Sequence, residues 1–317
     1  MTSNELSNAS ANQSFNLWYH PLYTDGIHVE ARFPRERYQI LLNRLKDSEQ
    51  FHMFAIREPR QISKDSLLLA HDATYVEEFL EQKLSEKEMR RIGLTPWTPK
   101  MIERTLCLTG GALEATIHAV NHGGITGNMA GGTHHAHRDF GSGYCIFNDL
   151  AICAMYAIEE LGVKRVAILD LDVHQGDGTA TILSNEARTR TISVHCSTNF
   201  PFRKSVSDFD LPVEPEAGDE LFMEKVREAV ELCVDFQPEL VLYQAGVDGL
   251  EQDHLGKLCV SRKGMQERNQ YVFEKMLKNR IPTVIFMGGG YSKPIEHSLD
   301  SFYDLFIDAS IWNKRWS

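Results

Sequence analysis

The stretch that decides the fold is residues 166–178, which read VAILDLDVHQGDG. Four aliphatic residues in a row are typical of a strand buried on both faces of a parallel sheet, and ligands bind where such strands end. Asp172 and His174 lie two residues apart, so on an extended backbone their side chains point to the same side. Buried acidic groups are costly unless a positive charge lies among them. The spacing therefore predicts an Asp-x-His pair that shares one metal ion.

Along the rest of the chain, apolar runs alternate with amphipathic helical patterns, as they do in βαβ units. The expected strands cover residues 125–129, 166–169, 191–195, 240–244 and 283–287. The expected helices cover residues 102–120, 150–161, 221–236 and 265–278, and the second has Asn148 or Asp149 as its N-cap and Gly162 as its stop. No internal repeat or low-complexity linker follows residue 15. The pattern predicts one doubly wound α/β domain over residues 16–317, after a disordered polar tail over residues 1–15.

Composition narrows the classes of function. The chain has 317 residues, 42% of them hydrophobic, which is enough to bury a large core. Its 33 basic and 44 acidic residues give a net charge of −11, which disfavours nucleic-acid binding and is compatible with a cationic substrate such as a lysine-rich peptide or a polyamine. No apolar run approaches the roughly 18 residues that span a membrane, and residues 1–14 lack the pattern of a secretion signal. The six cysteines include no C-x-x-C motif and are typical of a protein in a reducing compartment, so we expect a cytoplasmic location. The sequence does not indicate the oligomeric state.

Polar motifs follow several of the expected strands directly. GGTHH at residues 131–135 follows the first strand, GVDG at residues 246–249 follows the fourth, and GGGY at residues 288–291 follows the fifth. The carboxyl ends of parallel strands meet at one edge of the sheet, so these segments should converge in space.

Three side chains at these strand ends form a candidate metal site. Asp172, His174 and Asp248 would supply three ligands and leave a position open for water and substrate, as catalytic sites do. The ligand set suits zinc and also iron, manganese or cobalt. Taken alone, Asp248 would fit a turn residue between two glycines.

The tandem histidines His134 and His135 are candidates for acid/base chemistry, because Asp170 and Asp177 are not used by the predicted metal site. A carboxylate that accepts a hydrogen bond from one imidazole nitrogen fixes the tautomer and raises the basicity of the other nitrogen. Tyr291, after three glycines, could donate a hydrogen bond to an oxyanion opposite the metal.

These motifs, in this order, resemble the zinc-dependent histone deacetylase family. The resemblance rests on GGTHHAH (131–137), GSGYCIFND (141–149), DLDVHQGDG (170–178), AGVDGL (245–250) and GGGY (288–291), and it extends from about residue 16 to the C-terminus. RFP at residues 32–34 and HCSTNFPF at residues 195–202 are most similar to the class IV branch and its bacterial relatives. The resemblance implies an arginase-like fold with a central, mostly parallel eight-stranded sheet, helices on both faces, and a tunnel for an acyl-lysine side chain.

The resemblance also implies roles for individual residues. It gives Asp172, His174 and Asp248 as zinc ligands, Tyr291 as the group that polarises the acyl carbonyl, His135 with Asp177 as general base and acid, and His134 with Asp170 as an electrostatic dyad. Gly143 and Tyr144 match the tunnel floor and one wall, Phe202 or else Phe200 matches the other wall, and Leu255 or His254 falls near the rim. A structural K⁺ or Na⁺ site would draw on Asp170, Asp172, His174 and Ser193. No rim aspartate that holds the substrate backbone can be assigned from the sequence.

Several alternatives remain open at this stage. A two-metal ureohydrolase needs further carboxylates two residues beyond the ligands, where this chain has Gly176 and Leu250. An inactive acyl-lysine binding module would not need the complete set of ligands, dyads and tyrosine. Substrates compatible with the sequence are acetyl-lysine in a protein or peptide, longer acyl-lysine, and small amides such as acetylpolyamines.

Overall fold

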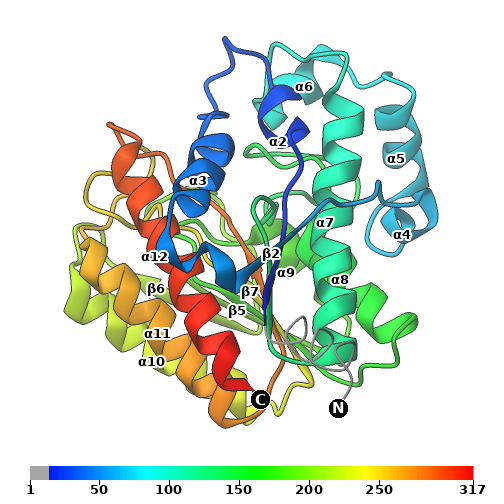
Figure 1. Cartoon of the computed structure of the whole chain (residues 1–317). Coiled ribbons are helices and arrows are strands. Elements are labelled where there is room, and N and C mark those ends of the chain that lie inside the picture. Colours follow the sequence, from blue (N-terminus) through cyan, green and yellow to red (C-terminus); the bar gives the residue numbers. More distant parts are fainter. Residues whose placement is uncertain (1–13, 317) are drawn as a thin grey trace, which may run out of the picture.

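A sheet of eight strands forms the centre of the computed structural model, which describes residues 14–316 (Figure 1). In order across the sheet the strands are β2 (Phe54–Arg57), β1 (Phe15–Trp18), β3 (Ile125–Asn128), β8 (Thr283–Phe286), β7 (Leu240–Gln244), β4 (Val166–Asp170), β5 (Thr189–Cys196) and β6 (Phe209–Val213). Every neighbouring pair is parallel. The predicted single α/β domain with an eight-stranded sheet is confirmed, and its sheet is parallel throughout.

The five strands expected from the sequence are all present, with ends that shift by up to two residues. They are central strands with fully or almost fully buried residues, which is why they read as continuous apolar runs. The prediction missed β1, β2 and β6. The last two are the edge strands, are partly exposed, and β6 contains Pro212, which an edge strand tolerates because one side of it needs no ladder hydrogen bond.

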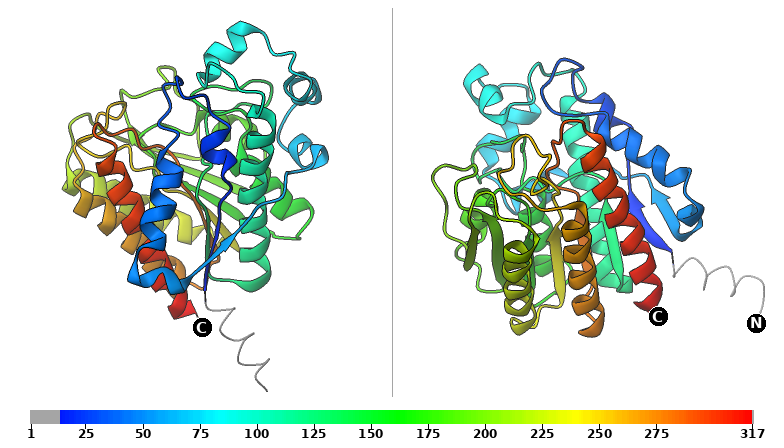
Figure 2. Two further views of the ribbon diagram at one scale, coloured as in Figure 1. Left: turned by 45° about the horizontal axis from the view of Figure 1, so that its top comes forward. Right: turned by 90° about the vertical axis from the view of Figure 1, so that its left-hand side faces the viewer.

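Long helices cover both faces of the sheet (Figure 1, Figure 2). On one face lie α10 (Asp219–Asp235), α11 (Arg262–Lys278) and α12 (Glu296–Asn313), and on the other lie α7 (Met101–His122) and α8 (Asp149–Glu159). The predicted N-cap of α8 is Asn148, whose side chain accepts a hydrogen bond from the Ala151 amide. These helices confirm the four that periodicity predicts and add α12.

Shorter helices complete the chain and were not predicted. They are α2 (Leu22–Asp25), α3 (Arg37–Lys46), α4 (Lys64–Leu68), α5 (Ala73–Leu80), α6 (Glu86–Ile92) and α9 (Asp177–Leu183), with the 3₁₀ turns η1 (Glu49–Met53) and η2 (Lys314–Trp316). Most have fewer than three turns, which is too short for a clear helical periodicity.

The predicted tail falls almost wholly on residues 1–13, which lie outside the described residues. Strand β1 begins at the buried Phe15, one residue before the predicted boundary. Within residues 14–316 no helix has the length and apolar character needed to cross a membrane. All six cysteines are free, and only Cys259 among them is exposed.

The order of the sheet explains why the polar motifs converge. Strands β3, β8, β7 and β4 are consecutive neighbours at its centre. The segments that follow them begin at residues 129, 287, 245 and 171, and they contain the four motifs singled out in the sequence. Because all four strands are parallel, these segments meet at one edge of the sheet.

Candidate active site

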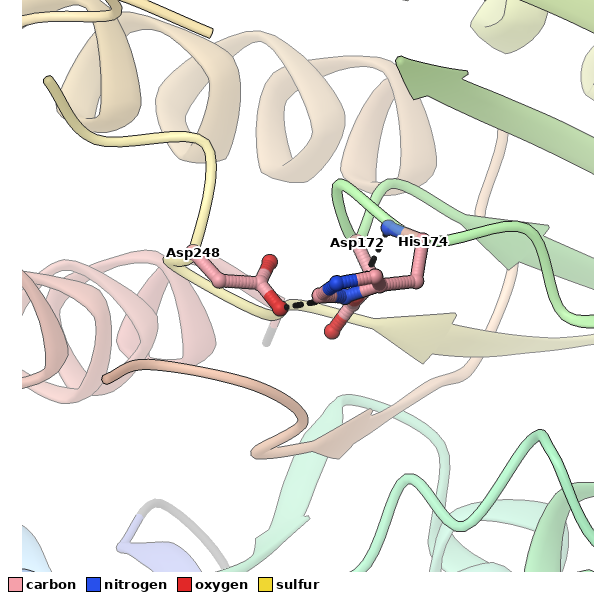
Figure 3. Close-up of side chains that lie close together, drawn as sticks. All are labelled: Asp172, His174 and Asp248. Carbon is pink, nitrogen blue, oxygen red and sulfur yellow. Dashed lines mark hydrogen bonds and ion pairs between the residues drawn. The ribbon is translucent and has the colours of Figure 1, made fainter. Parts of the chain in front are cut away.

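The predicted ligands Asp172, His174 and Asp248 come together at this edge (Figure 3). One ligand atom from each lies within 4.8 Å of the others, and His174 Nδ1 lies 3.1 Å from Asp172 Oδ1 and 3.0 Å from Asp248 Oδ2. All three residues are buried. Within residues 14–316 no other three histidine, cysteine or acidic side chains are close enough to share an ion.

Backbone amides hold the two carboxylates in place. Asp172 Oδ2 accepts a hydrogen bond of 2.8 Å from the Gly289 amide, and Asp248 Oδ1 accepts one of 2.9 Å from the Val173 amide. Each carboxylate thus has one oxygen fixed by the backbone and the other beside the imidazole of His174. Burial and the charge of Asp172 raise the pKa of Asp248 above its ordinary value. Two buried carboxylates and one imidazole therefore fit a divalent cation, which would relieve this repulsion.

Both predicted histidine dyads are in hydrogen-bond contact. His134 Nδ1 lies 2.7 Å from Asp170 Oδ2, and His135 Nδ1 lies 2.7 Å from Asp177 Oδ1. The two imidazole rings are 4.0 Å apart between centroids, and both histidines are buried. With each Nδ1 donating to a carboxylate, the Nε2 atom is left for other chemistry.

The two histidines have opposite pKa shifts. Burial would lower the pKa of His134, but the charges of Asp170 and Asp172 outweigh it and raise the pKa to about 9. Burial and the positive charge of His134 lower the pKa of His135 to about 4. At neutral pH His135 is therefore a free base and His134 a cation. Two titratable groups driven apart in this way can divide acid/base roles between them.

A third histidine that was not assigned a role shares the same acid. His137 Nε2 lies 3.1 Å from Asp177 Oδ2, and its Nδ1 lies 2.9 Å from the Thr181 hydroxyl. Although burial acts to raise it, the hydrogen bonds from His135 and His137 hold the pKa of Asp177 well below its usual range. Asp177 is therefore an anion that orients the imidazoles of His135 and His137. Ala136 separates the two histidines in the sequence, so the pattern did not indicate that they share one carboxylate.

Tyr291 is half-buried beside this cluster, and burial raises the pKa of its phenol, which stays protonated. Its backbone amide donates a 2.6 Å hydrogen bond to Asp253 Oδ2. Asp253 Oδ1 accepts two more hydrogen bonds, from the amides of Leu255 and Gly256 at 2.8 and 2.9 Å. Asp253, for which no role was predicted, thus joins the Tyr291 segment to the 253–256 turn.

A cavity of about 500 Å³ leads from the surface to His135, His174 and Tyr291, and the predicted wall residues Gly143, Tyr144, Phe202 and Leu255 all line it. Gly143 has a φ of +53°, and a Cβ there would lie 2.7 Å from His135 Cδ2. Only glycine allows the backbone to approach the imidazole this closely. Tyr144 packs against Tyr291 with 5.8 Å between ring centroids, and Leu255 is at the exposed end.

Both candidates for the opposite wall, Phe202 and Phe200, line the cavity, and they differ in exposure. Phe200, the second choice, packs edge-on against the His135 ring at 4.8 Å between centroids. Phe202, the first choice, is 89% exposed and touches Phe200 from outside. Both are aromatic residues of the Phe-Pro-Phe segment, so residue type alone could not tell which one points inward.

Three buried polar residues that were given no role at the site hold the histidine loop and His174 in place. The Asn148 side chain donates hydrogen bonds to the carbonyls of Ala136 and His134, at 2.9 and 3.3 Å. Its own backbone amide donates to His71 Nε2 at 2.8 Å. Asn199 lies 3.2 Å from His174 Nε2 and donates to the Leu255 carbonyl. Asn148 and Asn199 belong to motifs quoted above, but no spacing signal in the sequence indicates their contacts at the site, and His71 lies outside every motif.

The predicted monovalent-cation site stays a prediction. Asp170 is in register with Ser193 on the neighbouring strand, which brings their backbones together. The Ser193 hydroxyl lies 2.9 Å from His195 Nδ1.

Comparison with known proteins identifies the family. Residues 31–304 match the family model of the histone deacetylase domain. The chain belongs to the histone deacetylase family. It is 38% identical over 283 residues to an uncharacterized protein of Picosynechococcus sp., covering 89% of this chain and 93% of that protein. It is 34% identical over 250 residues to histone deacetylase 2 of Arabidopsis thaliana, covering 75% of this chain and 64% of that protein.

A solved structure shares the fold of this histone deacetylase family member. The acetylpolyamine aminohydrolase of Burkholderia pseudomallei superposes with a TM-score of 0.76 at 19% identity, over 92% of this chain and 98% of that one. Membership of the family indicates a hydrolase that acts on amides.

Proposed function

We propose that this protein hydrolyses the amide bond of an acyl-lysine side chain, with acetyl-lysine as the simplest substrate. The observation that carries the proposal is the buried Asp172, His174 and Asp248 cluster, which lies beside a neutral histidine and a protonated phenol at the inner end of an aromatic cavity. This is the set of groups that metal-assisted hydrolysis of an amide requires.

The metal would be held by Asp172, His174 and Asp248, and zinc is the metal we propose, with iron as the alternative. A bound divalent ion would polarise the acyl carbonyl and lower the pKa of water toward about 7.

His135 is the proposed general base. It is neutral at pH 7, and Asp177 fixes its Nδ1–H so that Nε2 is free to take a proton from the attacking water. The same Nε2 then returns the proton to the leaving lysine amine. His134 stays protonated through its contact with Asp170, so it contributes positive charge near the reacting carbonyl.

Tyr291 is the proposed donor to the oxyanion of the substrate, because its raised pKa keeps the phenolic proton in place. The aliphatic stem of lysine would pass between Tyr144 and Phe200, over Gly143. These aromatic surfaces exclude water from the stem and orient the amide toward His135.

The test is turnover of a fluorogenic acetyl-lysine peptide by the full chain after loading with Zn²⁺ or with Fe²⁺. We expect hydrolysis that chelation abolishes and metal restores. Longer acyl-lysine peptides and an acetylpolyamine, measured alongside, identify the preferred amide. Equal rates in chelated and metal-loaded protein would reject the mechanism. Hydrolysis of the polyamine alone would reject acyl-lysine as the substrate. The cytoplasmic location remains a further proposal, which fractionation of cells can check.

A further inference from the structure

The mouth of the active site is formed by two cavities that share three residues. The cavity of about 500 Å³ reaches His135 and His174, and a second of about 660 Å³ lies beside it at the surface. Tyr144, Leu255 and Tyr291 line both cavities. A substrate that reaches Tyr291 through the first cavity therefore lies next to the second.

Four cationic side chains stand around this mouth. Arg91 and Lys257 line the first cavity, and Arg32 and Lys293 line the second. All four are exposed. Neither cavity is lined by any aspartate or glutamate apart from those of the proposed catalytic and metal centre, so at the surface the lining is cationic only. We call these four residues the cationic rim.

Within the described chain the rim charges have no ion-pair partner. None of the four takes part in a salt bridge with any residue of the range 14–316. The polar contacts that Arg91 and Lys257 make are to neutral carbonyls, those of Gly141 and Thr198. Elsewhere on the surface many lysines and arginines are paired, as expected for a chain of net charge −11.

The nearby carboxylates are already engaged. Asp253 accepts hydrogen bonds from three backbone amides, including that of Tyr291. Glu88, one turn before Arg91, accepts hydrogen bonds from the amide and hydroxyl of Ser85 in a capping box. Both acids therefore form hydrogen bonds within their own segments. After the hydrogen bonds from Ser85, the charge of Arg91 helps to lower the pKa of Glu88, but the two side chains form no ion pair within residues 14–316.

The depth of the charges indicates which part of a substrate they meet. The proposed reacting groups are buried at the inner end, while the rim lies at the exposed end with Leu255. The acyl group would lie at the inner end and the lysine stem between the aromatic walls. The rim would then face the residues on either side of the acylated lysine.

We propose that the cationic rim selects acyl-lysine in an acidic sequence context and disfavours polycationic substrates, including acetylated polyamines and lysine-rich tails. The inference rests on the proposed deacylase function. The net charge of −11 is compatible with a cationic substrate, but the local charge at the mouth has the opposite sign to that of the whole chain. Local charge decides binding at short range, since salt screens charges beyond a Debye length of about 8 Å at physiological ionic strength.

The expected difference between peptides can be scaled from the strength of exposed ion pairs between rim cations and acidic flanking residues. Each is worth about 1.5- to 5-fold in an equilibrium constant, so several pairs together give about tenfold at low salt. The difference in kcat/KM should come mainly from KM, with kcat little changed, because the flanking residues do not touch the reacting amide.

The experiment compares three acetyl-lysine peptides of equal length whose two residues on each side are all Glu, all Gln or all Lys. The metal-loaded full chain is assayed at low and high NaCl, and N-acetylputrescine is a fourth substrate. We expect kcat/KM to fall in the order Glu, Gln, Lys at low salt, with N-acetylputrescine poor, and the differences to shrink at high salt.

A matched pair of variants assigns the effect to the rim. Lys257→Glu with Lys293→Glu leaves two cations and two anions at the rim, so the summed charge falls to zero and the order of the peptides should be lost. Lys164→Glu with Lys278→Glu makes the same change in net charge at the opposite end of the sheet, next to the starts of β4 and β8, and should leave the order unchanged. The inference would be overturned if the unmodified protein hydrolysed the three peptides at equal rates at low salt or preferred Lys flanks. It would also be overturned if both double variants changed the order of the peptides in the same way.

Loss of the proposed function is distinguishable from loss of the inference. If no acetyl-lysine peptide is hydrolysed, the deacylase proposal fails. Binding of the three labelled peptides, measured by fluorescence anisotropy, then tests whether the cationic rim prefers acidic flanking residues. Tighter binding of the Glu peptide that is lost in Lys257→Glu with Lys293→Glu supports the rim, and equal binding rejects it.

Discussion

The inner end of the active site and its rim are built on opposite principles. At the inner end, Asp170, Asp172 and Asp248 are buried, and backbone amides or imidazoles contact each of them. At the rim, Arg32, Arg91, Lys257 and Lys293 are exposed and have no ion-pair partner within residues 14–316. Charged groups that are buried and held by hydrogen bonds suit catalysis, because they can stabilise the transition state without changing their positions during the reaction. Unpaired charge in water suits selection among substrates, since it is free to bind them.

This comparison separates two kinds of variant. A change at the inner end should reduce the turnover of every substrate alike. A change at the rim should alter the order of substrates and leave the chemistry intact. The predictions below run from the largest expected effect to the smallest.

The largest effect is expected from removing a metal ligand. Asp172→Ala leaves His174 and Asp248 without their third partner, so bound metal and activity should both be lost. Metal content by plasma mass spectrometry and turnover of an acetyl-lysine peptide provide the two measurements. Full activity in a variant that retains no metal would contradict the proposed centre.

The next effect is expected from removing the base. His135→Ala should lower kcat about 10²- to 10⁴-fold while bound metal remains, because general acid–base catalysis contributes about that much. The ratio of rates for Glu- and Lys-flanked peptides should stay as in the unmodified protein. His137→Ala, which leaves the contact between His135 and Asp177 in place, is the comparison variant and should retain more activity.

Removal of the phenol should have a somewhat smaller effect. Tyr291→Phe keeps the ring contacts with Tyr144 and Phe33 and deletes only the hydroxyl. Loss of an oxyanion donor costs about 3 to 4 kcal/mol of transition-state stabilisation, or about 10²- to 10³-fold in kcat. Metal content should not change. A kcat within threefold of the unmodified enzyme would remove Tyr291 from the mechanism.

Stability should depend on pH through His71, which supports the inner end. Burial lowers the pKa of His71 to about 4, and its neutral Nε2 accepts the hydrogen bond from the Asn148 amide. The unfolded chain binds this proton near its ordinary pKa of about 6.5, so the contribution is complete above that pH and is lost as the pH falls toward 4. A shift of this size corresponds to at most about 3 kcal/mol.

The measurement is the free energy of unfolding in urea at pH 7.5 and pH 5, for metal-free protein and for metal-free His71→Gln. The other histidines are common to both proteins, so the difference in pH dependence isolates His71. The unmodified protein should lose more stability than the variant over this range. Parallel pH profiles would show that His71 is not the group responsible.

The smallest effect concerns a substrate that does not reach the rim charges. A small neutral acetyl-lysine amide without flanking residues should be hydrolysed by Lys257→Glu with Lys293→Glu at a rate within about twofold of normal, because exposed charges act weakly on an uncharged molecule. Assay of kcat and KM for this amide checks it. A tenfold loss would show that the rim residues act on the chemistry and would erase the distinction between the two regions.

The sequence predicted the features that depend on short-range pattern. The central strands β3, β4, β5, β7 and β8 were found because burial on both faces makes them continuous apolar runs. The cluster of Asp172, His174 and Asp248 and both dyads were predicted because their acidic and histidine residues lie in short motifs that follow these strands. The family resemblance supplied the full strand number and the tunnel.

The remainder depends on contacts between distant segments. Asp253 and His71 act through hydrogen bonds to backbone groups, which carry no signature in the sequence, and Asn148 was predicted only as an N-cap. The edge strands β2 and β6 are short and partly exposed, so their patterns are weak. The sign of charge at the mouth was likewise hidden, because Arg32, Arg91, Lys257 and Lys293 come from four separate segments.

The carboxylate of Asp253 has a consequence for retargeting this enzyme. It fastens the amide of Tyr291 and those of Leu255 and Gly256 to one anchor. A library that varies residues 254, 255 and 257 while retaining Asp253 can therefore explore new specificities without displacing the phenol. Gly256 has to stay as well, because a Cβ there would clash with the Asp248 carbonyl. A grafted loop that lacks this acid would remove the hydrogen bond to the Tyr291 amide, so turnover should fall together with the original preference for flanking residues. A graft should therefore begin after Asp253.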